Sequence, residues 1–465
     1  MHHNQMIDQL QDTISAIATP AGRSGIAIVR LSGAEAIEIA DRIFRGRRAL
    51  KRVKPWMATF GKVVDGEIEI DEAIAIVFRA PHSYTAEDMV EIHCHGGVYV
   101  SRRILELMVR EGARLAQPGE FTLRAFLNGR IDLSQAEAIA DLIQAQTEAG
   151  LRASFHQLQG ALSTKIGTIQ GQFVDLLSLL ELELDFAEED VEFVERGELI
   201  QKLKISQQDL EHLARSYEVG RLAREGVKLV IVGKPNVGKS SLLNALVKED
   251  RAIVTDIPGT TRDPLEVQLD VRGIWFRIFD TAGMKSTADK IEQEGVRRAR
   301  GHLASADVVV HMFDGSLPLD QDDLEIIAEI DKLKRARLIR VINKADLKQI
   351  IDHSLLESDA VPLLFISVVQ GTGLDNLEET IYRQVTQADN FFSDEILVTN
   401  ARHWEVLRNA AKYLEVAISE AEKGVSAEYV ALYLRDAVNE LGKITGKVTS
   451  EDILNNIFSK FCIGK

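Results

Sequence analysis

The stretch that most constrains this chain is Gly233-Lys-Pro-Asn-Val-Gly238-Lys239-Ser240, a complete G-x-x-x-x-G-K-S phosphate loop. It follows the apolar run 227–232 and precedes residues 241–247, whose apolar spacing is that of a helix. A loop of this kind needs glycines because its backbone N–H groups curl around a polyphosphate, while the N-terminus of the next helix faces the negative charge. The sequence therefore predicts a nucleotide site in an α/β domain.

Each residue of this loop has an expected role. Lys239 places a positive charge at the β- and γ-phosphates, and the Ser240 hydroxyl ligates Mg²⁺. The remaining nucleotide contacts expected from the loop are Asn236, Val237, Gly238 and Ser241.

Three downstream elements identify the nucleotide. Asp280-Thr281-Ala282-Gly283 ends the apolar strand 275–279 and places an acid near Mg²⁺ and a glycine N–H near the γ-phosphate. Asn343-Lys344-Ala-Asp346 follows the strand 338–342, and an Asp there can accept from both N1–H and the exocyclic amine of guanine. Ser367-Val368-Val369, after the strand 363–366, is expected to back the base, although it departs from the usual Ser-Ala-x start. The module is predicted to be a GTPase.

Length and composition limit the number of domains and the class of protein that the whole chain can form. With 465 residues and 45% apolar content the chain can bury more than one core, so two to four domains are expected. Neither a run of about eighteen apolar residues nor a signal-type apolar core is present, and the two cysteines give no disulfide framework, so a soluble cytoplasmic protein with no membrane association is expected. The net charge of −16 argues against indiscriminate nucleic-acid binding, but a local basic patch could still hold RNA.

The regions around the GTPase module differ in character. Residues 1–125 are predicted to form an α+β domain, with strands at 12–18 and 25–31, a helix at 33–44 and a hairpin-like pair at 67–78. Residues 126–225 are predicted to be long helices, and Ser134 with Glu137 has the pattern of a capping box.

Residues 388–465, which follow the GTPase module of residues 226–387, are helical again in pattern. Helical segments on both sides of a compact module suggest that the GTPase is inserted into one helical domain. Two separate helical domains are the alternative.

Three further features allow both a structural and a functional interpretation. Residues 42–54 contain seven basic side chains, a run more typical of a solvated loop than of an RNA contact. His93 and His95 would share one face of a strand and could suggest a metal, but no second ligand pair is evident. Cys462, close to the chain end, could reach a ligand site or have no role.

Several motifs together resemble the MnmE (TrmE) family of tRNA modification GTPases, and the resemblance runs over essentially the whole chain. Those outside the GTPase module are the specific ones, because many GTPases share the phosphate loop. They are residues 18–25 (Ala-Thr-Pro-Ala-Gly-Arg-Ser-Gly), 81–88 (Pro-His-Ser-Tyr-Thr-Ala-Glu-Asp), 117–128 (Gln-Pro-Gly-Glu-Phe-Thr-Leu-Arg-Ala-Phe-Leu-Asn) and 461–465 (Phe-Cys-Ile-Gly-Lys).

The resemblance implies a multidomain α/β protein: an α+β N-terminal domain like folate-binding one-carbon domains, a helical domain and an inserted Ras-like P-loop GTPase domain. It implies a homodimer formed through the N-terminal domain. It also implies a heterotetramer with the FAD-carrying partner MnmG (GidA), which adds an aminomethyl or carboxymethylaminomethyl group to C5 of the wobble uridine in certain tRNAs. The expected contacts to 5-formyltetrahydrofolate or a related folate are Arg30, Glu91, Arg130, where relatives often have Lys, and Lys465.

The resemblance also implies a hydrolytic mechanism. Met284 stands where Ras-like enzymes place a water-orienting Gln, and the family uses K⁺ in place of an arginine finger. The expected K⁺ ligands are Asn236, Thr255, the Ile257 carbonyl and Thr260, while Thr261 would complete the Mg²⁺ shell. The same loop is expected to touch GTP through Thr255, Asp256, Ile257, Pro258, Gly259, Thr260 and Thr261.

Three residues are candidates for catalytic roles. Lys239 would act on the phosphates, Glu292 would position water, although it could equally be a helix-capping charge, and Cys462 would act at the tRNA or folate site. Two rival functions remain open. One is a ribosome-assembly GTPase, and the other is a folate-dependent one-carbon transferase regulated by GTP.

Overall fold

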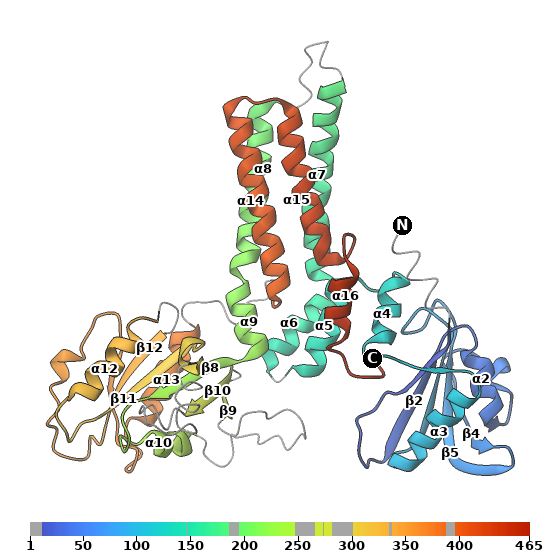
Figure 1. Cartoon of the computed structure of the whole chain (residues 1–465), viewed down its shortest axis with the longest axis horizontal. Helices are drawn as coiled ribbons and strands as arrows, with labels where there is room; N and C mark the ends of the chain where they lie inside the picture. Colours follow the sequence, from blue (N-terminus) through green and yellow to red (C-terminus); the bar gives the residue numbers. More distant parts are fainter. Residues whose placement is uncertain are drawn as a thin grey trace. The chain divides into compact units, whose positions relative to one another are not determined.

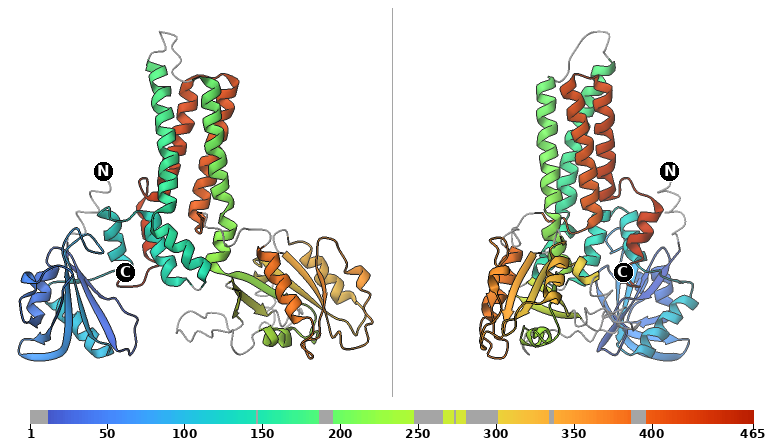
Figure 2. Two further views of the ribbon diagram at one scale, coloured as in Figure 1. Left: turned by 180° about the vertical axis from the view of Figure 1, so that it is seen from behind. Right: turned by 60° about the vertical axis from the view of Figure 1, so that its left-hand side comes forward.

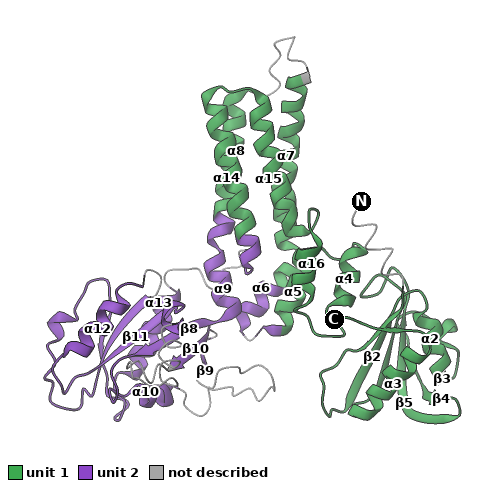
Figure 3. Cartoon of the chain, in the orientation of Figure 1, with its two compact units in different colours: residues 1–143, 155–211, 405–465 green, residues 144–154, 212–404 purple. Residues whose placement is uncertain are grey.

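The chain divides into two compact units (Figure 3). The computed structural model describes residues 12–145, 147–185, 195–246, 266–272, 274–280, 301–333, 337–386 and 396–465. The first unit contains residues 1–143, 155–211 and 405–465, and the second contains residues 144–154 and 212–404.

The first unit contains a seven-stranded mixed sheet in the order β3-β4-β5-β6-β2-β1-β7. Neighbouring strands are antiparallel except β1 and β7, which are parallel. The prediction of a hairpin-like pair at residues 67–78 is wrong in detail, because these residues form one long strand, β5. A turn at Gly66 connects β5 to its antiparallel neighbour β4. The strands are β1 (Ile14–Ile17), β2 (Ile26–Ser32), β3 (Phe44–Gly46), β4 (Ala58–Asp65), β5 (Ile68–Phe78), β6 (Met89–His95) and β7 (Arg114–Leu115).

Helices α2 (Ala36–Ile43) and α3 (Val98–Arg110) cover one face of this sheet (Figure 1). Their buried side chains join Val29, Leu31 and Ile92 in one apolar core. Because side chains alternate along a strand, the residues between these, including Arg30 and Glu91, lie on the opposite face. The opposite face thus carries charged residues, together with a second, smaller apolar cluster that includes Ile14 and Phe121.

The long helices α7 (Ala161–Asp185), α8 (Arg196–Arg215), α14 (Ala401–Lys423) and α15 (Ala427–Thr445) lie side by side (Figures 1 and 2). Segments from both sides of the GTPase module contact one another here. The Gln170 side chain donates to the Val438 carbonyl at 2.9 Å, and ion pairs join Lys204 to Glu422 at 2.7 Å and Arg435 to Glu181 at 2.6 Å. The predicted insertion of the GTPase into one helical domain is confirmed.

The start of α5 (Leu133–Gln144) corrects the predicted cap. Asp132 Oδ1 accepts from the Gln135 N–H at 2.9 Å, and the Gln135 side chain accepts from the Asp132 N–H at 2.9 Å. This reciprocal pair is a capping box, and it lies two positions earlier than the predicted pair Ser134 and Glu137. The remaining elements of this part of the chain are η1 (Leu50–Arg52), α4 (Glu120–Leu127), α6 (Glu148–Leu158), α9 (Tyr217–Glu225) and α16 (Glu451–Phe458).

The second unit contains a six-stranded sheet in the order β13-β12-β11-β8-β10-β9. All neighbouring pairs are parallel except β10 and the edge strand β9. The loops that follow β8 and β12 therefore emerge at the same edge, where ligands bind in such sheets. Its elements are β8 (Val227–Val232), α10 (Lys239–Leu246), β9 (Glu266–Val271), β10 (Ile274–Asp280), β11 (Val308–Asp314), α12 (Gln321–Ile330), β12 (Arg337–Asn343), η3 (His353–Leu355), β13 (Leu363–Phe365) and α13 (Leu374–Thr386).

None of the helices in the described ranges combines the length and apolar content needed to cross a membrane.

Candidate functional sites

The phosphate loop lies between β8 and α10. The ammonium of Lys239 is buried and donates to the backbone carbonyls of Gly233 at 2.9 Å and Lys234 at 2.8 Å. Gly238 has φ +103°, and a Cβ there would lie 2.4 Å from the Asn343 side-chain nitrogen. Only glycine fits this approach, which holds the loop against the strand that carries the base-recognition residues.

Asn343 links the two nucleotide loops. Its amide nitrogen donates to the Val237 carbonyl at 2.8 Å, and its amide oxygen accepts from the Val368 N–H at 3.1 Å. The Ser367 hydroxyl donates to Asp346 at 2.5 Å, so the element predicted to back the base lies beside the acid expected to read guanine. The structure thus brings these predicted residues together, while Val369 is 90% exposed.

Acidic partners orient two lysines of the site and were not predicted from the sequence. Lys344, at φ +64°, lies 2.5 Å from Asp314 at the end of β11, and Lys234 contacts Asp320 and Asp323 on the loop and first turn of α12. Burial alone would raise the pKa of Asp314, but hydrogen bonds from Lys344 and Ser316 hold it below its ordinary value. Asp314 reaches Lys344 because β11 and β12 pair in parallel, so that both strands end at the same edge of the sheet.

The remaining predicted residues of this site divide into those that the structure describes and those that it does not. The backbone of Asp280 ends β10 opposite Ile231 of β8, which places it beside the phosphate-loop strand. Asn236 lies in the phosphate loop at φ +66°, and Ser240 and Ser241 lie in the first turn of α10. The predicted residues outside the described ranges are Thr255, Asp256, Ile257, Pro258, Gly259, Thr260, Thr261, Thr281, Ala282, Gly283 and Glu292.

A second site forms on the face of the first unit's sheet that lies opposite α2 and α3. Arg30 on β2 and Glu91 on β6 are direct cross-strand neighbours, and their side chains pair through contacts of 2.9 and 2.7 Å. The Arg30 guanidinium also donates to the Gly464 carbonyl at 3.1 Å and lies 5.4 Å from the ring centre of Tyr84 and 5.5 Å from that of Phe121. Arg30 therefore connects two strands, two aromatic rings and the C-terminal residues.

The C-terminal residues turn tightly at this site. Gly464 has φ +96°, and a Cβ there would lie 2.6 Å from the Ile17 carbonyl. The Lys465 N–H donates to the Cys462 carbonyl at 3.3 Å, while the Cys462 thiol is free and its residue exposed. Burial, together with the nearby Arg30, lowers the pKa of Lys465. The structure thus brings Lys465 close to the predicted pair Arg30 and Glu91.

Arg130 reaches the same neighbourhood from the loop after α4. It donates to the Tyr84 carbonyl at 2.7 Å, and its guanidinium lies 5.1 Å from the centre of the Tyr84 ring. Two predicted cations, Arg30 and Arg130, therefore contact one aromatic residue. Sequence reasoning missed Tyr84 and Phe121 as site residues, although both lie inside the motifs that carried the family resemblance.

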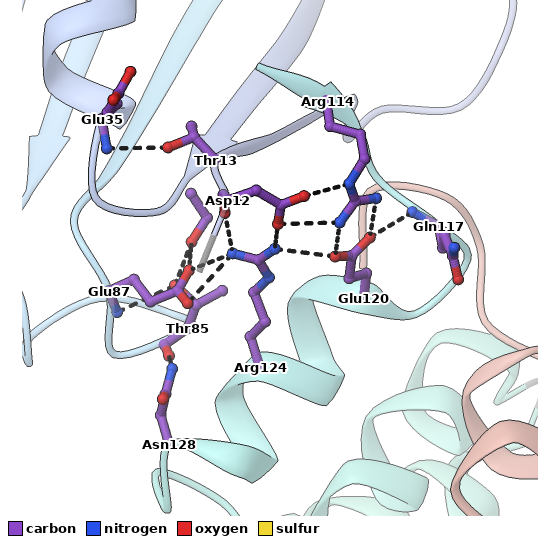
Figure 4. A network of polar contacts seen from close by, with 11 residues as sticks. Asp12, Thr13, Glu35, Thr85, Glu87, Arg114, Gln117, Glu120, Arg124 and Asn128 are labelled. Carbon is purple, nitrogen blue, oxygen red and sulfur yellow. Dashed lines mark hydrogen bonds and ion pairs between the residues drawn. The ribbon is translucent and has the colours of Figure 1, made fainter. Parts of the chain in front are cut away.

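A buried network of charges holds α4 against the sheet (Figure 4). Arg124 is 1% exposed and donates to Asp12 at 2.7 Å and to Glu120 at 3.1 Å, with Glu87 at 3.3 Å. Arg114 joins it by donating to Glu120 at 2.6 Å. Because α4 also carries Phe121, we infer that this network positions one of the two rings beside Arg30.

His93 and His95 have separate carboxylate partners. His93 lies 3.4 Å from Glu91, and His95 lies 2.7 Å from Asp71. Within the described ranges no group of three or more His, Cys, Asp or Glu side chains is arranged to hold a metal ion. Between the two histidines Cys94 is buried, and burial together with Asp71 raises the pKa of its thiol to about 11.

Comparison with known proteins relates this chain to one family over nearly its full length. A family model described as the TrmE N-terminus of GTP-binding proteins matches residues 13–130, and one for the MnmE helical domain matches residues 133–462. The chain is 46% identical over 461 residues to the tRNA modification GTPase MnmE of Thermoanaerobacter pseudethanolicus, covering 98% of this chain and 99% of that protein. It is 45% identical over 463 residues to the protein of the same name from Chlorobaculum tepidum, covering 97% of each.

Among solved structures, Era of Aquifex aeolicus bound to GDP and aluminium fluoride matches 40% of this chain and 67% of that chain, with 28% identity and a TM-score of 0.29.

Proposed function

Because the chain belongs to the MnmE family of tRNA modification GTPases, we propose that it couples GTP hydrolysis to the modification of tRNA. It acts with the FAD-carrying partner MnmG, in a heterotetramer, to add a carboxymethylaminomethyl or aminomethyl group to C5 of the wobble uridine of certain tRNAs, in the cytoplasm. The observation that carries this proposal is the 46% identity over 98% of the chain, which spans both compact units.

In this proposal residues 226–387 are the GTPase domain, and residues 126–225 and 388–465 form the helical domain. GTP binds at the carboxyl edge of the second unit's sheet. The ammonium of Lys239 leaves the carbonyls of Gly233 and Lys234 for β- and γ-phosphate oxygens. The carboxylate of Asp346 accepts from the N1–H and the amine of guanine.

Two cations complete the nucleotide site in this proposal. Mg²⁺ is held by Ser240 and Thr261, and K⁺ by Asn236, Thr255, the Ile257 carbonyl and Thr260. Ser240 and Asn236, the two with described backbones, supply the hydroxyl and amide oxygens that such hard cations prefer. The cations supply positive charge beside the phosphates, and Glu292 orients the attacking water. Hydrolysis is therefore faster in K⁺ than in Na⁺, and equal rates would remove K⁺ from the proposal.

In the first unit, residues 1–125 form the folate-binding and dimerisation domain of a homodimer. A 5-formyltetrahydrofolate or related folate contacts Arg30, Glu91, Arg130 and Lys465. The chemistry of these side chains fits such a ligand, because Glu91 can accept from amino groups of a pterin, and three cations can hold the carboxylates of its glutamate. The rings of Tyr84 and Phe121 both lie close to the Arg30 guanidinium. Cys462 acts at this site.

The test is nucleoside mass spectrometry of bulk tRNA from cells that carry Lys239→Ala in place of the normal chain. Loss of the 5-aminomethyl-type wobble uridines, with other modifications intact, is the expected result. Lys348→Ala, which removes an exposed lysine of the same unit, is the matched control and leaves the profile unchanged. An unchanged profile for Lys239→Ala together with an imbalance of ribosomal subunits would instead indicate a ribosome-assembly GTPase.

A further inference from the structure

The basic run at residues 42–54 begins at the end of α2, continues through the edge strand β3 and ends just after η1. Leu50 is fully buried, and its N–H donates to Asp41 Oδ1 at 2.6 Å. Val53 is also buried, and its N–H donates to the Leu50 carbonyl at 3.1 Å. The segment is therefore anchored at two apolar residues, and its charged side chains project from a fixed backbone.

The seven basic residues of this segment fall into two groups. Three have partners: Arg42 donates to the Glu111 carbonyl at 2.8 Å, Arg45 donates to the Asp41 carbonyl at 3.1 Å, and Lys51 lies 3.4 Å from Glu38. Among the residues that the structure describes, the other members of the run have neither an acidic partner nor a side-chain hydrogen bond. These are Arg47, Arg48, Arg52 and Lys54, all of them exposed.

An exposed aromatic residue lies directly beyond the basic run. Trp56 is 64% exposed, and its backbone has φ +65°, which is unusual for so large a residue. The backbone N–H of Trp56 donates to the Val77 carbonyl at 2.9 Å, and its ring meets the Phe78 ring edge to face, with the ring centres 4.8 Å apart. These contacts hold the indole in place while leaving it open to solvent.

We propose that Arg47, Arg48, Arg52, Lys54 and Trp56 form a docking surface for the phosphate backbone of RNA. This choice of partner rests on the proposed function, which makes the RNA a tRNA. Unpaired guanidinium groups bind phosphates in bidentate fashion, and an exposed indole can stack on a splayed base. The backbone is already ordered, so less entropy is lost on binding.

Because the chain as a whole is acidic, a local basic surface restricts where on the protein an RNA can bind. The net charge is −16, yet residues 42–54 contain no acidic side chain. A polyanion meets net repulsion from the chain as a whole and local attraction at this segment. The surface thus sets where and in which orientation the RNA docks, and carries no sequence information of its own.

The experiment compares the full-length protein with the variant Arg47→Ala/Arg48→Ala/Arg52→Ala/Lys54→Ala, using fluorescently labelled bulk tRNA over a salt series. Each phosphate contact contributes about −0.9 to the slope of log affinity against log salt, so the loss of four contacts should make the slope shallower by roughly 3.6 units and weaken binding at least about tenfold. Trp56→Gly, which suits the positive φ, should weaken binding about tenfold with little change in the salt slope.

The matched control removes the same number of positive charges from the long helices. It replaces Lys165, Lys202, Lys204 and Lys423, each of which is paired with an acidic side chain, by alanine. The control should bind tRNA as the unchanged protein does, and GTP hydrolysis without tRNA should be equal in all variants.

Three other outcomes overturn the proposal, and they differ from one another. Equal binding by the surface variant and the control, with wobble modification intact in cells, removes the surface but leaves the tRNA modification function standing. A surface variant that binds tRNA normally but changes its sedimentation would show that the segment contacts protein. If the unchanged protein binds no tRNA and its loss leaves tRNA nucleosides unaltered, the proposed function fails as well.

Discussion

The two candidate sites of this protein are built in opposite ways. In the nucleotide site, the linked groups come from loops that follow parallel strands of one sheet, and Asn343 joins the phosphate loop to the loop that begins at Ser367. In the site around Arg30, the partners come from β2, β6, α4 and the C-terminal residues, and the hydrogen bond from Arg30 to Gly464 spans 434 positions. Changes in the first site should therefore alter ligand chemistry with little loss of stability, whereas changes in the second should alter both.

The largest effect should come from the base-recognition acid. Asp346→Asn keeps the shape that accepts from Ser367 but loses the carboxylate that guanine needs, so we expect kcat/KM for GTP to fall by about 10³-fold. Xanthosine triphosphate should restore activity, because its C2 oxygen can accept from the new amide. Both are measured by phosphate release. If this variant also lost folate binding, a change in the nucleotide site would have disturbed the second site, contrary to the difference proposed between them.

In the second site, Arg30→Met should cost about 3 kcal/mol of local stability, because it leaves the Glu91 carboxylate, which is 12% exposed, without its cation. Hydrogen exchange of the β2 and β6 amides in the full chain measures this loss. The double variant Arg30→Met/Glu91→Leu should recover most of it, since neither charge then remains. Formyl-tetrahydrofolate binding should be absent from both, and single and double variants of equal stability would contradict the argument.

A substitution at Gly464 tests whether folate binding depends on the position of the C-terminal residues and not on backbone strain at a positive φ. Gly464→Ala should weaken folate binding about tenfold, because its Cβ would lie 2.6 Å from the Ile17 carbonyl and displace the turn that places Lys465. Gly66→Ala is the matched control, since it also has a positive φ but faces open space. It should cost about 1 kcal/mol locally and leave binding, measured by titration calorimetry, unchanged. Equal folate affinities of Gly464→Ala and Gly66→Ala would show that the C-terminal residues do not shape the site.

The smallest effect concerns the buried network of α4. Burial raises the pKa of Glu120, but hydrogen bonds from Arg114 and the Gln117 N–H lower it overall. The folded-state pKa is depressed, so the ionised group stabilises the fold above its unfolded value of about 4.5, and this contribution is lost as the pH falls through the folded pKa. Glu120→Gln should thus be about 1 kcal/mol less stable at pH 7 and equal to the unchanged protein in strong acid. A constant difference across pH, measured by hydrogen exchange, would contradict this.

Much of the nucleotide site was predictable because its chemistry is encoded in consecutive residues. The loop 233–240, the base-recognition element and Ser367 each follow a recognisable strand, and parallel strands bring their ends to one edge. Asp314 and Asp320, which pair with the site lysines, carry no such motif. They become visible only when β11 and α12 are placed beside the loops.

The sequence by itself determined the nucleotide loops, the helical character of the flanking segments and, through its motifs, the family. Only the tertiary structure decided that Tyr84 and Phe121 flank Arg30, that Arg124 is buried among Asp12, Glu87 and Glu120, and which members of the basic run are unpaired. The physical reason is the separation along the sequence of the residues involved. A phosphate loop depends on the backbone conformation of a few consecutive residues, whereas the charge and aromatic contacts depend on which distant segments pack together.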